Sequence, residues 1–355
     1  MNIRNLLPLP LVLMGTVAMN SLAAPVPVPE ARIERFDTAL DAIVAPDAPI
    51  EKLASGFIWS EGPVWIDDGS YLLFTDVPGN TLYRWSGRDG LSVFLKPSGY
   101  TGTEQGIFRE PGANGLFPDR AGTILMADHG NRQVARFDLK TKAKTPLATH
   151  FEGKRFNSPN DVTRRRDGVV FFTDPPYGLE GLNDSKHKEL SFNGVYRIDL
   201  DGSVHVIDRE MTFPNGLALS PDERTLYVAT SDPERPIWMA FTLNERGEAV
   251  SKRVFADASD LHKAKNPGLP DGMRVTGDGT IFATAPGGVL IMNTSTPEQV
   301  VRGYWWADLI PRAVATIARR YPPLERIRAL LASAGFSEVS AYPSLDGILQ
   351  QRNYL

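Results

Sequence analysis

The chain has 355 residues, with 38 Lys and Arg against 42 Asp and Glu, a formal charge of −4 and no cysteine. Mild acidity argues against a nucleic-acid-binding protein, which normally carries a basic stripe, and the absence of cysteine excludes disulfides, thiolate zinc sites, iron–sulfur clusters and a cysteine nucleophile. Glycine and proline number 31 and 28, about 17% of the chain against roughly 12% in average proteins, which favours many turns and β-structure.

Residues 1–24 predict a cleaved signal peptide. Arg4 supplies a positive start, residues 6–18 are mostly apolar, and Ser21-Leu22-Ala23 has the small residues of a signal-peptidase site. The alternative is a membrane anchor, but the apolar run of about 13 residues is shorter than the ~20 that a spanning helix needs. We therefore expect a periplasmic or secreted protein that is not held in a membrane after cleavage.

The body of the chain repeats a pattern about every fifty residues. Each unit opens with a polar residue beside a glycine or aspartate, and a turn and a β-rich run follow. Equivalent positions lie 53, 46, 55 and 56 residues apart, at Gly62, Gly115, Asp161, Gly216 and Gly272. Such a period is typical of a β-propeller, with a stacked solenoid as the alternative. Five units are visible and we expect Ile33–Gly56 to help form a sixth, so the sequence predicts an all-β, six-bladed β-propeller over residues 25–296.

Residues 297–355 depart from this pattern. Leu309, Ala313, Val314, Ile317 and Tyr321 fall at helical spacing, and a second amphipathic set ends at Gly335. We expect an atypical, mostly helical C-terminal segment. It could cap the propeller as a natural variation, or reflect a fusion or a gene-model error. It could also replace part of the last blade and leave the ring open, with an unpaired sheet edge.

The opening residues of the repeats are the candidates for chemistry. In a propeller the first strand of each blade lines the central channel, so equivalent positions surround one axis. Two carboxylates and three amides would form this ring: Glu61, Asn114, Asn160, Asn215 and Asp271. Oxygen donors suit a divalent cation, Ca²⁺ first, with Mg²⁺, Mn²⁺ or Zn²⁺ as alternatives. Asn and Asp beside glycine could instead simply form turns, but their recurrence in five units favours the cation, as does Glu, a poor turn residue.

Two basic side chains are candidates for substrate binding. His129 follows a predicted strand and could face the channel mouth or belong to a turn. Arg155 stands five residues before Asn160 and could bind an anionic or polyol substrate, or be a solvated loop residue. The chain lacks a Gly-x-Ser-x-Gly elbow, a Walker loop and a Gly-x-Gly-x-x-Gly loop, so the sequence does not support a serine-hydrolase or nucleotide site.

Ordered motifs at blade spacing cover roughly residues 50–292: Ser60–Trp65, Ala113–Leu116, His129–Arg132, Lys154–Val162, Phe172–Gly178, Pro214–Asp222 and Pro270–Met273. As a set they resemble the gluconolactonase/regucalcin-like (SMP-30/gluconolactonase) family of six-bladed propellers, and within it the bacterial gluconolactonase branch. The resemblance implies one divalent ion, usually Ca²⁺, held by Glu61, Asn215 and Asp271. It places Asn160 beside that ion, in contact with the ion or the substrate, and Arg155 near the family's substrate-binding arginine.

The function implied by the resemblance is a metal-dependent hydrolase that opens a sugar lactone, of the D-glucono-1,5-lactone type, to the aldonic acid. The cation would polarise the carbonyl, and Asp271 would be the base for an attacking water. Asn160, Arg155, Asn114 and His129 are the candidates for binding this small molecule. Phosphotriester or aryl-ester hydrolysis on the same metal site stays open, as does a non-catalytic exported propeller. The sequence alone selects neither the exact lactone, nor the ion, nor the oligomeric state.

Overall fold

The structure is a computed structural model that describes residues 26–27, 32–35, 38–293 and 301–306. The expected signal peptide, residues 1–24, lies outside the described residues, as do residues 307–355 of the expected helical segment. In the described ranges, no helix is long and apolar enough to cross a membrane. The helices found there are short: α1 (Ser259–Lys263) and the 3-10 turns Thr38–Ala42, Asp67–Gly69, His129–Asn131 and Leu182–Asp184.

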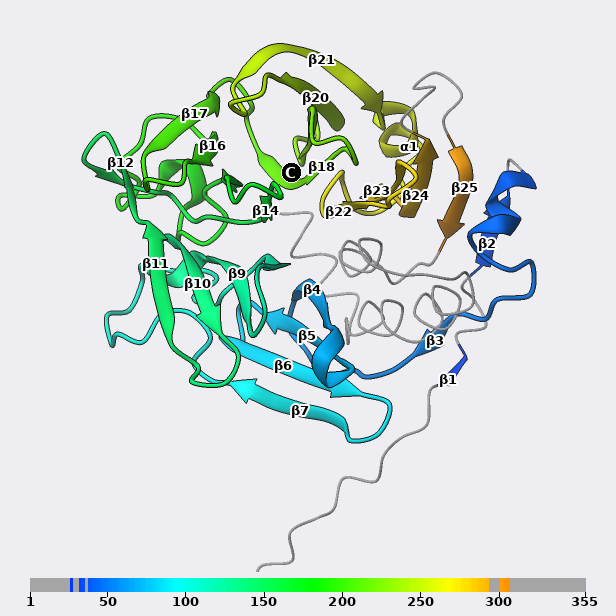
Figure 1. Ribbon diagram of the computed structural model, residues 1–355, viewed down its shortest axis with the longest axis horizontal. Helices are drawn as coiled ribbons and strands as arrows, with labels where there is room; N and C mark the ends of the chain where they lie inside the picture. The colour runs from blue at the N-terminus through cyan, green and yellow to red at the C-terminus, as the bar shows by residue number, and fades with distance from the viewer. Residues whose placement is uncertain (1–25, 28–31, 36–37, 294–300, 307–355) are drawn as a thin grey trace, which may run out of the picture.

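Five antiparallel sheets surround a central axis as the blades of a propeller (Figure 1). Four of them are four-stranded meanders, in which each strand pairs with the next along the chain. Small two-stranded sheets lie beside the blades, including β12 (His150–Phe151) with β13 (Lys154–Arg155). The strands of the four meanders are β4 (Ser60–Ile66), β5 (Tyr71–Asp76), β6 (Thr81–Ser86), β7 (Gly90–Leu95); β8 (Leu116–Pro118), β9 (Thr123–Asp128), β10 (Gln133–Asp138), β11 (Lys144–Ala148); β14 (Val162–Arg164), β15 (Val170–Asp174), β16 (Gly194–Ile198), β17 (Val204–Asp208); and β18 (Pro214–Leu219), β19 (Thr225–Thr230), β20 (Ile237–Leu243), β21 (Ala249–Asp257).

The fifth blade joins strands from two distant parts of the chain. Its first three strands are β22 (Met273–Val275), β23 (Thr280–Ala285) and β24 (Gly288–Asn293). Next comes β25 (Val301–Trp306), beyond the expected propeller end at residue 296, and β2 (Arg32–Arg35) pairs with it as a fifth strand. β3 (Glu51–Lys52) pairs instead with β1 (Val26–Pro27).

The predicted sixth blade is not found among the described residues, which form five blades. Ile33–Gly56 was expected to build part of that blade. Its strand β2 instead satisfies the backbone groups at the edge of β25, which would otherwise lack partners in the described sheet. The two ends of the propeller therefore meet in one sheet, that of the fifth blade.

The first strand of each blade lies at the channel, and neighbouring first strands contact one another in the order β4, β8, β14, β18 and β22. Apolar layers between the blades hold these strands in place. Between the second and third blades Phe172 stacks on Tyr196, with 5.1 Å between ring centroids, and Phe156 packs edge-on against both rings. Fully burying one such side chain contributes about 1.5–3 kcal/mol, so the layers give the channel residues a rigid support.

Glycine follows four of the five polar residues at the channel, and at Gly115 and Gly216 the first strands of neighbouring blades approach each other closely. A Cβ at Gly115 would lie 2.7 Å from the carbonyl oxygen of Asn160, and one at Gly216 would lie 2.3 Å from that of Asp271. The Gly115 N–H also donates to the Asn160 carbonyl at 2.8 Å. Only glycine, which has no side chain, fits where two backbones approach so closely. The turn interpretation therefore does not apply to these two Asn-Gly pairs.

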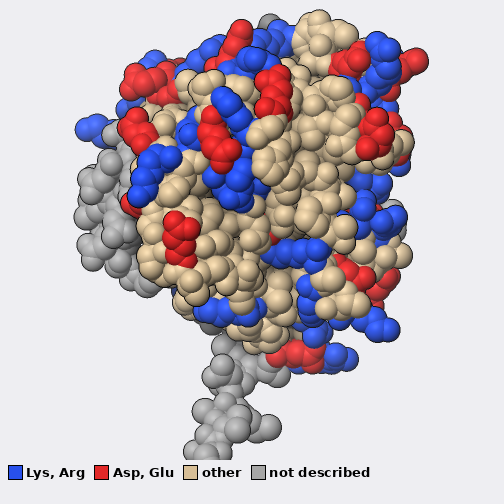
Figure 2. Space-filling view, turned by 90° about the vertical axis from the view of Figure 1, so that its left-hand side faces the viewer, with Lys and Arg blue, Asp and Glu red and all other residues tan. Residues whose placement is uncertain are grey.

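Charges on the outer surface are mixed in sign. On the face shown in Figure 2, Lys and Arg are interspersed with Asp and Glu. Exposed charges also pair with one another, as Arg246 does with Glu248 at 3.0 Å. The single-sign stripe that nucleic-acid binders carry is not formed on that face.

Candidate functional site

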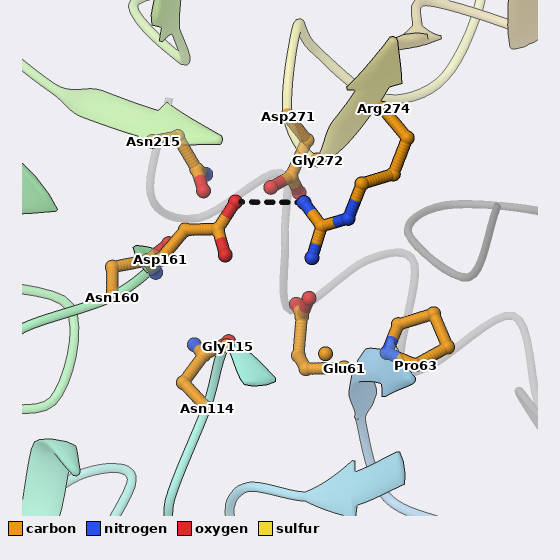
Figure 3. Close-up of a pocket in the computed structure, with 11 residues that line it drawn as sticks. Glu61, Pro63, Asn114, Gly115, Asn160, Asp161, Asn215, Asp271, Gly272 and Arg274 are labelled. Carbon is orange, nitrogen blue, oxygen red and sulfur yellow. Dashed lines mark ion pairs between the residues drawn. The ribbon is translucent and has the colours of Figure 1, made fainter. Parts of the chain in front are cut away.

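A pocket opens in the channel at the start of the inner strands (Figure 3). It encloses about 280 Å³, its open mouth included. All five residues predicted to ring the channel line this pocket, one from each blade: Glu61, Asn114, Asn160, Asn215 and Asp271. Each of them is at most 8% exposed. The repeat therefore identified the lining of one buried, oxygen-rich pocket.

Partners outside the pocket orient two of these side chains. The indole Nε1 of Trp59 donates to Oε1 of Glu61 at 2.6 Å. The amide Nδ2 of Asn215 donates to Oγ of Ser231 at 2.9 Å, and that hydroxyl donates to the carbonyl oxygen of Pro270 at 2.5 Å. Because the amide nitrogen of Asn215 is held by Ser231, its Oδ1 remains as an acceptor for the pocket. Neither Trp59 nor Ser231 was among the residues predicted to contribute to the site.

A buried ion pair also lines the pocket, and its two residues had no assigned function in the sequence analysis. Nη1 of Arg274 lies 3.7 Å from Oδ2 of Asp161, with their side chains 3% and 10% exposed. Arg274 donates to the carbonyl oxygens of Met273 and Leu116, and Asp161 accepts the backbone N–H groups of Val162 and Leu217. Burial raises the pKa of Asp161 and lowers the pKa of Arg274, and the pairing opposes both shifts. This pair thus links the inner strands of four blades.

The charges that line the pocket are unbalanced. Glu61, Asp161 and Asp271 are three carboxylates, and Arg274 is the single guanidinium, so the formal sum is −2. Buried charge of one sign is costly unless it is paired, and one divalent cation would balance it.

The donor atoms fit such a cation. Glu61, Asn160, Asn215 and Asp271 offer carboxylate and amide oxygens, which suit Ca²⁺, Mg²⁺ or Mn²⁺. In the described part of the chain, no group of three or more His, Cys, Asp or Glu residues is arranged to hold a metal. A cation here would therefore need the amide oxygens, and the pocket offers Zn²⁺ neither an imidazole nor a thiolate.

The two basic candidates lie elsewhere. His129 is fully buried behind Asn114, its Nε2 lying 3.3 Å from the amide Nδ2 of that residue, and it is not among the residues that line the pocket. Arg155 lies on β13, where its Nη2 donates to the carbonyl oxygen of Asn131 at 3.0 Å. Arg155 does not line the pocket either. Of the four predicted substrate-binding residues, the structure brings Asn114 and Asn160 into the pocket.

Acidification is expected to destabilise the fold through His129. Burial, with a smaller contribution from the charge of Arg109, lowers the pKa of His129 to about 3. In the unfolded chain this imidazole takes up a proton near pH 6.5, so the unfolded state binds more protons between pH 6.5 and pH 3. The stability that neutral His129 contributes is complete above pH 6.5 and is lost as the pH falls toward 3.

Urea unfolding of the natural protein and of His129→Gln at pH 7.5 and pH 4.5 measures this contribution. The natural protein should lose more of its free energy of unfolding between the two pH values than the variant, which lacks the titrating group. Equal losses in the two proteins would contradict the assignment.

The comparisons with known proteins agree with this geometry. Residues 59–307 match the family described as the SMP-30/gluconolactonase/LRE-like region. The gluconolactonase of Zymomonas mobilis is 43% identical over 262 residues, which are 73% of this chain and 74% of the relative. The solved structure of a gluconolactonase from Xanthomonas campestris matches with a TM-score of 0.68 at 28% identity, covering 85% of this chain and 91% of that chain.

A more distant relative has a different activity in its name. The diisopropyl-fluorophosphatase of Loligo vulgaris is 24% identical over 225 residues, which are 60% of this chain and 68% of the relative. The family match contains all five pocket residues of the ring as well as Asp161 and Arg274.

Proposed function

The chain belongs to the SMP-30/gluconolactonase/LRE-like family and is a gluconolactonase-like hydrolase, and we propose that it opens a sugar lactone of the D-glucono-1,5-lactone type with the help of one divalent cation, Ca²⁺ in the first instance. The observation that supports this proposal is the convergence of four oxygen donors in a pocket whose charges sum to −2. The 43% identical relative bears the name gluconolactonase, which supports the choice of substrate class.

The pocket residues divide into holding and reacting roles. Glu61, Asn160, Asn215 and Asp271 would hold the cation, and when bound it would polarise the lactone carbonyl as a Lewis acid. The Asp271 carboxylate takes a proton from the water that attacks the acyl carbon. The acyl–oxygen bond of the ring then breaks, Asp271 returns its proton to the released ring oxygen, and the product is the open-chain hydroxy acid. Arg155 has no part in this scheme, because its guanidinium contacts Asn131 outside the pocket.

Removal of the cation is expected to abolish lactone hydrolysis. D-glucono-1,5-lactone is supplied to the protein with Ca²⁺, acid release is followed, and excess chelator is then added. Turnover should fall to the uncatalysed rate, because the lactone carbonyl loses its Lewis acid. Restored turnover after Ca²⁺ is added back would show that the chelator had not unfolded the protein. Undiminished turnover in chelator would contradict the metal dependence.

The relationship to a diisopropyl-fluorophosphatase supports a second candidate function, hydrolysis of phosphotriesters or aryl esters in the same pocket. The two activities separate by substrate. A panel that contains D-glucono-1,5-lactone, diisopropyl fluorophosphate and phenyl acetate should give the highest kcat/KM for the lactone. A higher kcat/KM for either of the other two would favour the second function.

A further inference from the structure

A fully buried histidine lies directly behind one side chain of the pocket. His129 is 0% exposed, and its Nε2 is 3.3 Å from Nδ2 of Asn114, which lines the pocket. On the other side of the ring, Nδ1 faces Oε2 of Glu110 at 3.6 Å, an electrostatic contact that is longer than a hydrogen bond. Glu110 is itself 4% exposed and forms an ion pair with Arg109. Successive contacts thus connect Arg109, Glu110, His129 and Asn114, from the loop before β8 to the pocket.

The donors and acceptors on these side chains determine which nitrogen of His129 carries the hydrogen. A neutral imidazole has one N–H donor and one acceptor nitrogen, and burial keeps His129 neutral. The carboxylate of Glu110 can only accept, so it favours the hydrogen on Nδ1. Nε2 is then the acceptor, and it can take a hydrogen bond from the NH₂ group of Asn114 but not from its oxygen.

The surroundings hold this imidazole in place. A Cβ at Gly130 would lie 1.9 Å from the carbonyl oxygen of Pro111, so the turn after His129 packs directly on the loop that carries Glu110. That loop is anchored in turn, because the N–H groups of Arg109 and Glu110 donate to the carbonyl oxygen of Gly178 at 3.0 and 3.3 Å. A Cβ at Gly178 would lie 3.2 Å from Cγ of His129. The ring therefore has little room to turn away from Asn114.

We propose that His129 and Glu110 are positioning residues that fix the amide of Asn114 with its Oδ1 toward the pocket, where it accepts a hydrogen bond from a hydroxyl group of a polyhydroxylated lactone. In Figure 3 the oxygen of Asn114 lies on the side of the pocket centre and its nitrogen on the far side. An amide oxygen can accept but not donate, so it contacts a hydroxyl and gives no hydrogen bond to the carbonyl or ring oxygen of a lactone. This inference rests on the proposed lactone hydrolysis, and it assigns part of the selectivity for hydroxylated lactones to Asn114.

The tautomer of His129 tests the positioning directly and needs no activity. Long-range ¹H–¹⁵N correlation spectra of protein labelled with [¹⁵N]histidine should show the hydrogen on Nδ1, with the signal assigned by its absence in His129→Gln. In Asn114→Asp the group that faces Nε2 becomes a pure acceptor, so both ring nitrogens then face carboxylates and a hydrogen should appear on Nε2 in addition to Nδ1. An Nε2–H tautomer in the natural protein would overturn the positioning role.

Kinetics test the hydroxyl contact. The measured quantity is the ratio of kcat/KM for D-glucono-1,5-lactone to kcat/KM for δ-valerolactone, which has no hydroxyl groups. His129→Asn can reach Glu110 but offers no acceptor at the position of Nε2, and the ratio should fall about 3- to 10-fold, the value of one hydrogen bond. His129→Gln places an amide oxygen near that position and should recover most of the ratio.

The two readouts separate this inference from the proposed function. An unchanged ratio in His129→Asn, in an enzyme that hydrolyses both lactones, would overturn the hydroxyl contact alone. Absence of turnover with both lactones in the natural, calcium-loaded protein would overturn the contact together with the proposed function. The tautomer would still decide whether His129 holds the Asn114 amide.

Discussion

Asp271→Asn is expected to lower kcat for D-glucono-1,5-lactone by about 100- to 10,000-fold at saturating Ca²⁺, because the amide keeps an oxygen ligand but cannot accept the proton of the attacking water. Asp271 is 5% exposed and lines the pocket with Glu61 and the three amides. The substitution also changes the pocket charge from −2 to −1, so weaker Ca²⁺ binding should accompany the loss of rate. Steady-state kinetics over a Ca²⁺ series, with Ca²⁺ affinity from calorimetry, separate the two effects.

Two control variants distinguish the base from a mere ligand. Glu61→Gln removes the same charge from a residue that holds no reacting proton in the proposed scheme, so raising Ca²⁺ should recover most of its rate. Asp201→Asn changes an exposed turn residue and should leave both kcat and Ca²⁺ affinity as they are. If saturating Ca²⁺ restored Asp271→Asn to within about 10-fold of the natural enzyme, well short of the effect of a lost general base, Asp271 would be only a ligand.

The ring of oxygen donors could be predicted because a propeller repeats. Glu61, Asn114, Asn160, Asn215 and Asp271 occupy the same place in five units, and the fold brings equivalent places to one axis. The partners that orient these side chains differ in residue type from blade to blade, because His129 contacts Asn114 after β9 whereas Ser231 holds Asn215 after β19. No repeated residue type therefore marks Ser231 or His129 in the sequence.

Other features depended on contacts that sequence spacing does not encode. His129 was assigned to the channel mouth or a turn, and only packing places it behind Asn114. Arg274 left a weak signal, a charge within the apolar strand of Met273 and Val275, but its acceptor at Leu116 lies 158 residues away. The number of blades was overestimated because β2 was expected to begin a sixth sheet, whereas it extends the fifth. Sequence patterns thus located the donors, and the packing between blades determined their orientation.

Arg274→Met is expected to lower the free energy of unfolding by about 3–5 kcal/mol in the presence of chelator, because it leaves the buried carboxylate of Asp161 without its counter-charge. The carbonyl oxygens of Leu116 and Met273 also lose their guanidinium donors. Urea-induced unfolding measures the loss. The double variant Arg274→Met with Asp161→Asn should recover a large part of it, because no uncompensated charge is then buried.

The matched control for this loss is Arg246→Met. Its guanidinium also pairs with a carboxylate, that of Glu248 at 3.0 Å, but the two side chains are 79% and 43% exposed. Such a pair is worth less than about 1 kcal/mol. If Arg274→Met cost no more than this control, the buried pair would not be needed to join the inner strands.

The same variant also tests the electrostatic role of Arg274 in the pocket. Without the guanidinium the lining charge changes from −2 to −3, so Ca²⁺ should bind more tightly to folded Arg274→Met than to the natural protein. Because a ligand that binds only the folded state stabilises it by an amount that grows with the logarithm of its affinity, Ca²⁺ should raise the unfolding free energy of the variant more than that of the natural protein. An equal or smaller gain would mean that Arg274 is too well neutralised by Asp161 to influence the cation.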